Sequence, residues 1–322
     1  MHDGVFTETS RTQARPGGTP RRRLLVIVNG LSATWRARRL AATLKALRDL
    51  GCAIEERRTE AAGDPLHLAR AVRGADVDAI VVAGGDGTIN EVINGLLSCG
   101  ADRAMPPLAI IPLGTANVLA GEIGLDLDPL RVARAIVFGP ARAIRLGQAQ
   151  DGNGGPSRLF SLMAGAGFDA HVVDRVDAGL KARFRKGAYV LEMLRQLWRF
   201  PFRTYRITLD GRSLDAASVV AAKARFYGGR FVIAPKAGLD RPEFEVVVFK
   251  RSGPWNAVRY AVALALDRLA RLPDVDVVTA RVLTIEGPPG DPVQADGDIV
   301  AYLPVTLTIL PPALEIVTPA GP

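Results

Sequence analysis

Two apolar runs in the first half of the chain each lead directly into a glycine-rich stretch and then into a helical pattern. Residues 77–83 lead into GGDGT at 84–88, and residues 108–112 lead into LGTAN at 113–117. A third apolar run, at 24–28, ends at Asn29 and precedes a helical pattern over 35–50. Strands that alternate with helices predict a parallel sheet covered on both faces. We therefore expect an α/β domain over residues 23–139.

The second half of the chain has a different pattern. Short strand-like runs lie between Gly, Pro and Asp turns, at 160–163, 205–209, 218–222, 245–249, 281–285 and 305–309. Such runs are typical of antiparallel sheets that pack face to face. Two helical stretches, 187–200 and 255–272, interrupt them. We therefore expect an all-β domain, a β-sandwich, over residues 140–305.

Composition excludes several classes of protein. The 322 residues are 48% hydrophobic, which is enough for two domains with cores of their own. No window reaches the roughly 18–20 apolar residues of a membrane-spanning helix. Two cysteines, Cys52 and Cys99, are too few for a disulfide framework or a four-cysteine zinc site. We expect a cytoplasmic protein whose residues 1–22 form a disordered basic tail.

The net charge of +8 is concentrated locally. Eight Lys and Arg residues lie between Lys181 and Arg206, against one acidic residue, Glu192. Such a segment suits an acidic partner surface. Because no helix-turn-helix, zinc-finger or aromatic RNA-binding motif accompanies it, we expect no nucleic acid and favour an anionic membrane surface.

The two glycine-rich junctions predict a phosphate-binding site. Ligands of open α/β sheets bind beyond the carboxyl ends of the strands, where glycine allows close approach and helix N-termini offer N–H groups. Neither a Walker loop nor a GxGxxG fingerprint is present. An acidic residue beside phosphate, Asp86, suggests a magnesium ligand. The plain alternative is that the glycines form turns and Asp86 caps a helix.

The residues of these loops carry a resemblance to a known family. GGDGTINEVING at 84–95 and PLGTANVLA at 112–120 resemble the diacylglycerol kinase catalytic-domain family, the bacterial lipid kinases related to sphingosine kinases. GAGFDA at 165–170, YGG at 227–229, IAPKA at 233–237 and DGD at 296–298 follow in the family's order. The similarity spans nearly the whole chain after the tail.

The resemblance implies an ATP- and Mg²⁺-dependent kinase that phosphorylates a lipid hydroxyl. It also implies that an α/β nucleotide-binding domain joins a β-sandwich across a cleft, with a return strand at about 306–318 completing the first domain. Carried over to this chain, the nucleotide-binding residues would be Asn29, Ser32, Gly84, Gly85, Gly87, Thr88, Glu91, Gly114, Thr115 and Asn117. Asp86 would organise magnesium.

The general base is left open between two carboxylates. Asp298 matches the base of the family, but Asp-Gly-Asp between strands is also a common hairpin turn, and Asp86 is a rival for the role. The sequence departs from the usual pattern at Gly30, Ala33 and Val118. These departures leave open a catalytically impaired ATP-binding regulatory protein, and GGDGT alone would also suit an NAD kinase.

A basic segment precedes the helical pattern at 187–200. Lys181, Arg183, Phe184, Arg185 and Lys186 combine cations with an aromatic ring, as suits a membrane interface. We expect them to contact an anionic membrane, so that the protein is peripheral to the inner membrane face. For the helix itself, packing of its apolar face on the β-domain is an equal alternative. A homodimer is compatible with the sequence.

Overall fold

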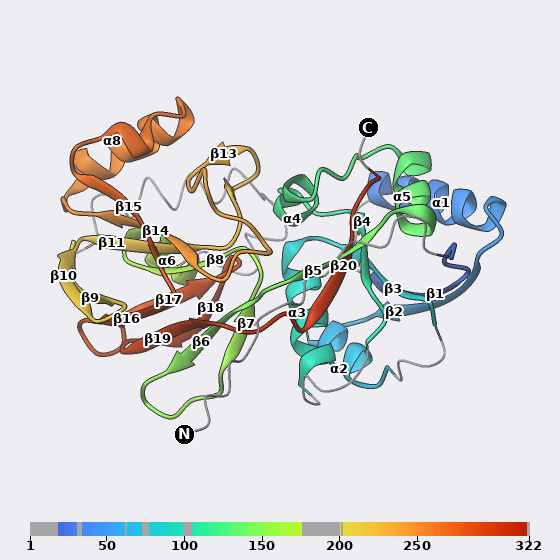
Figure 1. Ribbon diagram of the computed structural model, residues 1–322, viewed down its shortest axis with the longest axis horizontal. Coiled ribbons are helices and arrows are strands. Elements are labelled where there is room, and N and C mark those ends of the chain that lie inside the picture. The colour runs from blue at the N-terminus through green and yellow to red at the C-terminus, as the bar shows by residue number, and fades with distance from the viewer. Residues whose placement is uncertain are drawn as a thin grey trace, which may run out of the picture.

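The computed structural model describes residues 19–30, 34–61, 63–72, 77–98, 105–175, 200 and 202–320. Two domains lie side by side, and the chain crosses between them twice (Figure 1). It leaves the first domain between β5 (Ala141–Ile144) and β6 (Gly147–Asp151), and it returns between β19 (Val305–Ile309) and β20 (Leu314–Val317).

The first domain is built on a six-stranded sheet in the order β2-β1-β3-β4-β20-β5. Strands β1 to β4 and β20 pair in parallel, and β5 pairs antiparallel to β20 at the edge. The remaining strands of this sheet are β1 (Arg23–Asn29), β2 (Ala53–Thr59), β3 (Ala79–Gly84) and β4 (Leu108–Pro112). The predicted α/β domain with a parallel sheet is confirmed, and the antiparallel edge strand β5 makes the sheet a mixed one.

Helices cover both faces of this sheet, because the side chains of β1 are apolar on both of its faces. Leu24, Val26 and Val28 point into one core with α1 (Thr34–Asp49) and α5 (Pro129–Phe138). Leu25 and Ile27 point into the other, with α2 (Asp64–Arg70) and α3 (Asp86–Leu97). Because successive side chains of a strand alternate between faces, a wholly apolar strand needs cover on both sides.

The second domain consists of two six-stranded sheets packed face to face, which confirms the predicted β-sandwich. One sheet has the order β10-β9-β16-β19-β6-β7 and the other β15-β14-β11-β8-β17-β18. Phe160 and Phe244 stack between them with ring centroids 5.8 Å apart. The strands not yet given are β7 (Arg158–Phe160), β8 (Met163–Ala166), β9 (Tyr205–Leu209), β10 (Arg212–Ala216), β11 (Ser218–Ala222), β14 (Phe244–Phe249), β15 (Val275–Ala280), β16 (Val282–Glu286), β17 (Pro292–Ala295) and β18 (Asp298–Tyr302).

Short elements decorate the two domains. The helices not yet given are α4 (Val118–Glu122), α6 (Phe168–Arg175), α8 (Pro254–Ala265) and the 3-10 turn η1 (Leu269–Arg271). A two-stranded hairpin, β12 (Phe226–Tyr227) with β13 (Phe231–Val232), projects from the sandwich. Among the described residues, no helix is both long and apolar enough to cross a membrane.

The domain limits differ in detail from the sequence expectation. Arg21, assigned to the tail, donates hydrogen bonds from Nη1 to the carbonyl oxygens of Ile136 and Gly139, because α5 ends beside it. β5 extends the first sheet beyond residue 139. At the chain end β20 joins the first sheet, whereas β19, which overlaps the start of the expected return strand, lies in the sandwich.

Candidate active site

The two glycine loops lie in contact at the carboxyl ends of β3 and β4. A Cβ atom placed on Gly85 would lie 2.9 Å from Cα of Gly114, and one placed on Gly114 would lie 2.6 Å from Cα of Gly85. Neither loop therefore has space for a side chain at this point. Gly84 is equally confined, because its Cβ would lie 2.7 Å from Cβ of Thr88. The predicted junctions come together as one backbone surface.

The N-terminus of α3 opens onto that surface. The helix begins at Asp86, so Gly87 and Thr88 belong to its first turn and not to a loop. Its N-cap residue, Gly85, has an extended backbone and supplies no side-chain cap. N–H groups at an uncapped helix N-terminus, together with the helix dipole, favour an anion such as phosphate.

Asp86 serves as a cap for a second helix. Its Oδ2 accepts a hydrogen bond from the backbone N–H of Val118 at 3.1 Å, and its Oδ1 accepts one from Leu119 at 3.1 Å. Burial raises the pKa of the Asp86 carboxyl, and these backbone hydrogen bonds oppose the rise. Asp86 thus links the first turns of α3 and α4, which fixes the two loops relative to each other.

Side chains from the first strand and the first helix complete the surface. Asn29 donates a hydrogen bond from Nδ2 to Oγ1 of Thr88 at 2.8 Å. Arg36 donates from Nη2 to Oγ1 of Thr115 at 3.2 Å. Sequence reasoning missed Arg36, although its place in the first turn of α1 puts it at the same sheet edge. Ser32 lies outside the described residues.

The departure at Gly30 has a local reason. A Cβ atom at Gly30 would lie 2.2 Å from the carbonyl oxygen of Thr59, and the Gly30 N–H donates to Oγ1 of Thr59 at 3.2 Å. Proline would lack that N–H and would clash. The first loop therefore keeps its path with glycine in this position.

Asn117 adopts the left-handed conformation just before α4, with φ of 50°. Its Nδ2 donates to the carbonyl oxygen of Gly114 at 3.0 Å, which closes the second loop. Its Oδ1 is buried and has no hydrogen-bond partner among the described residues. Asn117 therefore presents an open acceptor beside the two glycines.

The second domain brings Asp298 to the start of α3. The β17–β18 hairpin places Oδ2 of Asp298 3.7 Å from the position that a Cβ of Gly87 would occupy. Asp298 is an exposed residue at the first position of β18. Two residues that are more than two hundred positions apart in the chain thus meet across the domain boundary.

Glu91 lies one turn further along α3 and interacts with Asp298. Burial raises the pKa of the Glu91 carboxyl, the backbone N–H of Gly63 opposes this, and the negative charge of Asp298 raises the pKa further. Oε2 of Glu91 is buried and has no hydrogen-bond partner among the described residues. Among the described residues, no three acidic, His or Cys side chains gather into a cluster that could hold a metal ion by themselves, so Glu91 offers one buried carboxylate oxygen and not a complete ligand set.

A buried clasp built on Asp296 holds the hairpin in place. Its Oδ2 accepts from Ser161 N at 2.8 Å, from Ser161 Oγ at 3.1 Å and from Asn90 Nδ2 at 2.9 Å. Its Oδ1 accepts from Leu162 N at 2.9 Å and Met163 N at 3.0 Å. Because Asn90 belongs to α3 and the other donors to the sandwich, Asp296 connects the two domains directly beneath Asp298.

Asn94 strengthens the same junction from the next turn of α3. Its Nδ2 donates to the carbonyl oxygen of Leu159 at 3.0 Å, and its Oδ1 accepts from the N–H of Leu159 at 2.9 Å. The sequence marks Asn90 and Asn94 only as polar residues of a helix; their partners at β7 lie in another domain.

A second bridge connects α4 to the sandwich. Glu122 is paired with Arg225, which donates from its backbone N to Oε2 and from Nε to Oε1, both at 2.9 Å. Tyr227, in the β12–β13 hairpin, donates from its hydroxyl to Asp169. Burial raises the pKa of the Asp169 carboxyl, and this hydrogen bond opposes the rise. These contacts give the GFDA and YGG motifs a place in one hydrogen-bonded unit.

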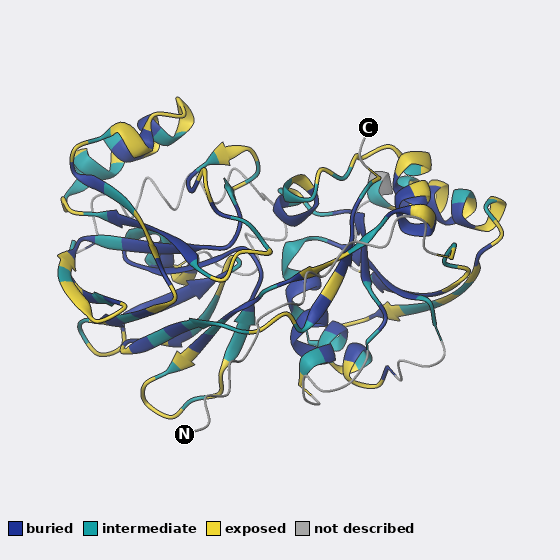
Figure 2. Ribbon diagram, in the orientation of Figure 1, coloured by how far each residue is buried: buried dark blue, intermediate teal, exposed yellow. Residues whose placement is uncertain are grey.

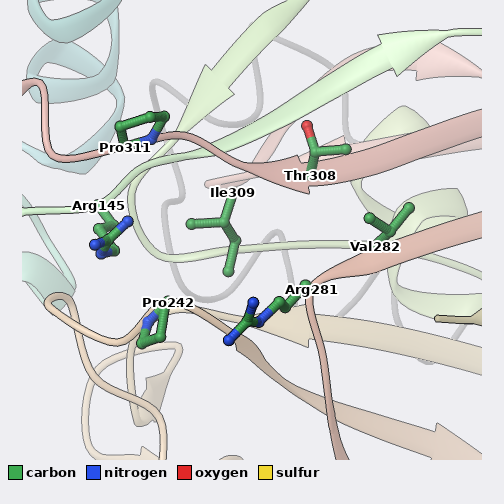
Figure 3. Close-up of a pocket in the computed structure, with 7 residues that line it drawn as sticks. All are labelled: Arg145, Pro242, Arg281, Val282, Thr308, Ile309 and Pro311. Atoms are coloured by element: carbon green, nitrogen blue, oxygen red, sulfur yellow. The ribbon is translucent and has the colours of Figure 1, made fainter. Parts of the chain in front are cut away.

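A cavity of about 370 Å³ lies near the crossing between the domains and away from the glycine loops. Figure 3 shows Arg145 and Arg281 on either side of Pro242, with Ile309 facing them. The predicted membrane-contact residues Lys181, Arg183, Phe184, Arg185 and Lys186 lie outside the described residues.

Comparison with known proteins agrees with this geometry. Residues 23–149 match the model of the diacylglycerol kinase catalytic domain, and residues 163–318 match that of the YegS C-terminal NAD kinase beta sandwich-like domain. A diacylglycerol kinase of Mycobacterium tuberculosis is 32% identical over 80% of this chain and 82% of its own length. One of Bacillus subtilis is 30% identical over 69% of this chain and 71% of its own.

The fold has solved counterparts. The crystal structure of a diacylglycerol kinase from Bacillus anthracis superposes with a TM-score of 0.70 at 23% identity, covering 92% of this chain and 96% of that one. At this identity the superposition supports the fold alone. The two matched domain models and the sequence relatives together show that this chain belongs to the diacylglycerol kinase catalytic-domain family and is a kinase.

Proposed function

We propose that this kinase transfers the γ-phosphate of ATP, with Mg²⁺, to a hydroxyl group of a membrane lipid of the diacylglycerol or sphingoid kind. The observation that carries the proposal is the meeting of Asp298 with Gly87 at the uncapped N-terminus of α3. In such an arrangement the Asp298 carboxylate would act as proton acceptor beside phosphates bound at the start of α3. Phosphoryl transfer needs mainly this positioning and the neutralisation of charge.

The nucleotide phosphates would lie on the backbone of the two glycine loops. The first turn of α3 offers N–H donors there, and Arg36 beside Thr115 adds a guanidinium that matches phosphate geometry. The family supports ATP as the phosphate donor. Gly85 and Gly114 keep the surface open, since a side chain at either would meet the backbone of the other loop.

Magnesium would be held by Glu91, with Asp298 beside it. The fit rests on the buried Oε2 of Glu91, which has no hydrogen-bond partner among the described residues. Asp86 suits the role less well, because both its oxygens already accept backbone N–H groups. A bound Mg²⁺ would neutralise the charge that accumulates on the transferred phosphoryl group.

Asp298 is the better candidate for the general base. Its exposed position at the domain boundary leaves it within reach of a substrate hydroxyl, whereas Asp86 caps α4. The hydroxyl oxygen would bond to the γ-phosphorus while the bond from that phosphorus to the oxygen of ADP breaks. The hydroxyl proton would pass to the Asp298 carboxylate.

The test is transfer of radiolabel from γ-labelled ATP to a panel of acceptors in mixed micelles. The lipid acceptors are diacylglycerol, sphingosine, ceramide and phosphatidylglycerol, and NAD is the non-lipid acceptor. We expect label on one lipid class, a loss of about 10²-fold or more in Asp298→Asn, and dependence on added Mg²⁺ after treatment with EDTA. The matched control is Asp215→Asn, an exposed aspartate of β10 that forms an ion pair with Arg206.

Three outcomes would count against the proposal. Label on NAD would favour an NAD kinase, and the absence of label on any acceptor despite ATP binding would favour a regulatory protein. Full activity of Asp298→Asn would remove the assigned base even if a lipid is labelled.

A further inference from the structure

Helix α8 exposes a face that contains only apolar side chains. Trp255 is 76% exposed and Leu266, at its C-cap, is 62% exposed. Spacings of three and four residues place the apolar residues on one side of the helix. The exposed members are Trp255, Val258, Ala261, Val262, Ala265 and Leu266. We call this set the α8 stripe.

The opposite face of α8 is fixed to the sandwich. Tyr260 is buried, with its ring centroid 5.0 Å from that of Phe249, and its hydroxyl donates to Oδ2 of Asp274 at 2.6 Å. Arg259 donates to the same carboxylate. Tyr260, Arg259 and Ala263 therefore lie on the side of the helix that packs on the protein, and the exposed apolar residues lie on the other side.

The neighbouring hairpin extends the apolar surface. Phe231 of β13 is 45% exposed, and α8 contacts β13. Figure 1 places α8 and β13 along the same edge of the molecule, and Figure 2 shows exposed residues on both. The hairpin also contacts α4, which Asp86 caps. The surface thus lies on elements that continue to the candidate nucleotide site.

Basic residues flank the α8 stripe in sequence and adjoin Phe231 on the neighbouring hairpin. Arg230, Arg268 and Arg271 are exposed, and none of the three forms an ion pair within the described part of the chain. Arg251, at the N-terminal end of α8, has a side chain that is 70% exposed. The acidic exception among the exposed neighbours in sequence is Asp267.

We propose that the α8 stripe and Phe231 insert into the interface of an anionic phospholipid membrane while these arginines contact the lipid headgroups. An apolar helix face with a tryptophan at one end and cations around it suits the boundary between acyl chains and headgroups. The choice of a bilayer as occupant rests on the proposed lipid-kinase function. A second copy of the chain is less suitable as the occupant. If two α8 helices packed on each other, parallel or antiparallel, the arginines at the ends of one helix would lie against those of the other.

The test measures binding without catalysis. Vesicles of phosphatidylcholine with a minor fraction of phosphatidylglycerol, free of substrate lipid and ATP, are sedimented with the full chain. We expect Trp255→Glu and Leu266→Glu each to lower the vesicle-bound fraction at least about tenfold at low salt, because each replaces an inserted side chain with a charge that the anionic surface repels. The matched control is Leu130→Glu, on α5 of the other domain, where the wild-type leucine is 48% exposed.

Tryptophan emission supplies a second readout. Binding of the wild type should shift the emission to shorter wavelength, and Trp255→Phe should remove most of that shift while it retains binding. Thermal melting of every variant verifies the fold. Equal binding of Leu266→Glu and wild type would overturn the proposal. A dimer that Leu266→Glu dissociates, without loss of vesicle binding, would assign the stripe to a second copy instead.

The design separates this inference from the proposed function. On a water-soluble short-chain diacylglycerol, Leu266→Glu should keep the wild-type rate, whereas on vesicles it should lose activity in proportion to binding. If the wild type phosphorylates no lipid but Leu266→Glu still loses vesicle binding, the membrane surface stands and the kinase assignment fails. If the wild type phosphorylates a lipid but Leu266→Glu binds vesicles as the wild type does, the kinase assignment stands and the membrane surface on α8 fails.

Discussion

The two aspartates of the Asp-Gly-Asp turn should differ in their response to substitution by asparagine: one variant should lose stability and the other should lose kinase activity. Asp296 accepts five hydrogen bonds at the domain boundary, whereas Asp298 is exposed beside Gly87. We predict that Asp296→Asn destabilises the protein. Asparagine tolerates the left-handed backbone of residue 296, which has φ of 51°. The effect therefore comes from the lost acceptor and not from backbone strain.

The magnitude follows from the number of donors. An asparagine keeps one acceptor oxygen and presents an NH₂ group in place of the other. In its better orientation the oxygen serves the three donors at Oδ2, and the NH₂ group faces the N–H groups of Leu162 and Met163, which are buried. A buried donor without an acceptor costs about 1–3 kcal/mol. Two such donors give a loss of about 3 kcal/mol, which lowers Tm by on the order of 10 °C at this size.

Differential scanning calorimetry of the two variants provides the assay. Asp298→Asn should melt within about 2 °C of wild type, as expected of a surface substitution, while it loses kinase activity. Asp296→Asn should show the large fall in Tm. Equal melting temperatures for the two variants would refute the account of Asp296 as a hydrogen-bonded clasp.

Three further predictions concern the phosphate surface and a buried lysine. Arg36→Ala should raise KM for ATP about tenfold with little change in Tm, since it removes the guanidinium beside Thr115; an unchanged KM would exclude phosphate contact. Gly85→Ala should lower kcat/KM about 10²-fold, because the Cβ of the new alanine would push the backbone of Gly114 away. Wild-type kinetics in this variant would contradict the close contact of the two loops. Burial lowers the pKa of Lys223 to about 8 from 10.5. The unfolded chain therefore keeps the Lys223 proton to higher pH, so the free energy of unfolding of the wild type should rise between about pH 8 and pH 10.5. Denaturant titration of Lys223→Met should show no such rise. Parallel pH profiles of stability for the two proteins would contradict the lowered pKa.

The fold class could be predicted because local patterns are repeated along the chain. Wholly apolar strands such as residues 79–84 alternate with helices, and this requires a sheet covered on both faces. The limits between domains were less accurate. β5 and β20 complete the first sheet through an antiparallel pairing of segments far apart in sequence, which no local pattern encodes.

The candidate site could be predicted in part. The glycines, Asn29 and Thr88 were found because their loops follow buried strands, and parallel strands bring their carboxyl ends to one edge. Glu91 was included among the nucleotide-binding residues, but its unpartnered oxygen and the charge of Asp298 beside it become visible only in the folded chain. Ser32 and the basic segment at 181–186 stay predictions.

The sequence by itself determined the two domain types, the two glycine loops and the family, since each depends on residues close together in the chain. Only the tertiary structure decided that Asp86 caps α4, that Asp296 joins the domains and that Asp298 meets α3. It also decided which side of α8 faces solvent, because the polar residues Arg259 and Tyr260 find their partner, Asp274, within the sandwich and so lie on the face toward the protein. The physical reason is the same throughout: periodicity records what a residue's neighbours in sequence are, whereas these roles depend on partners that folding alone brings into contact.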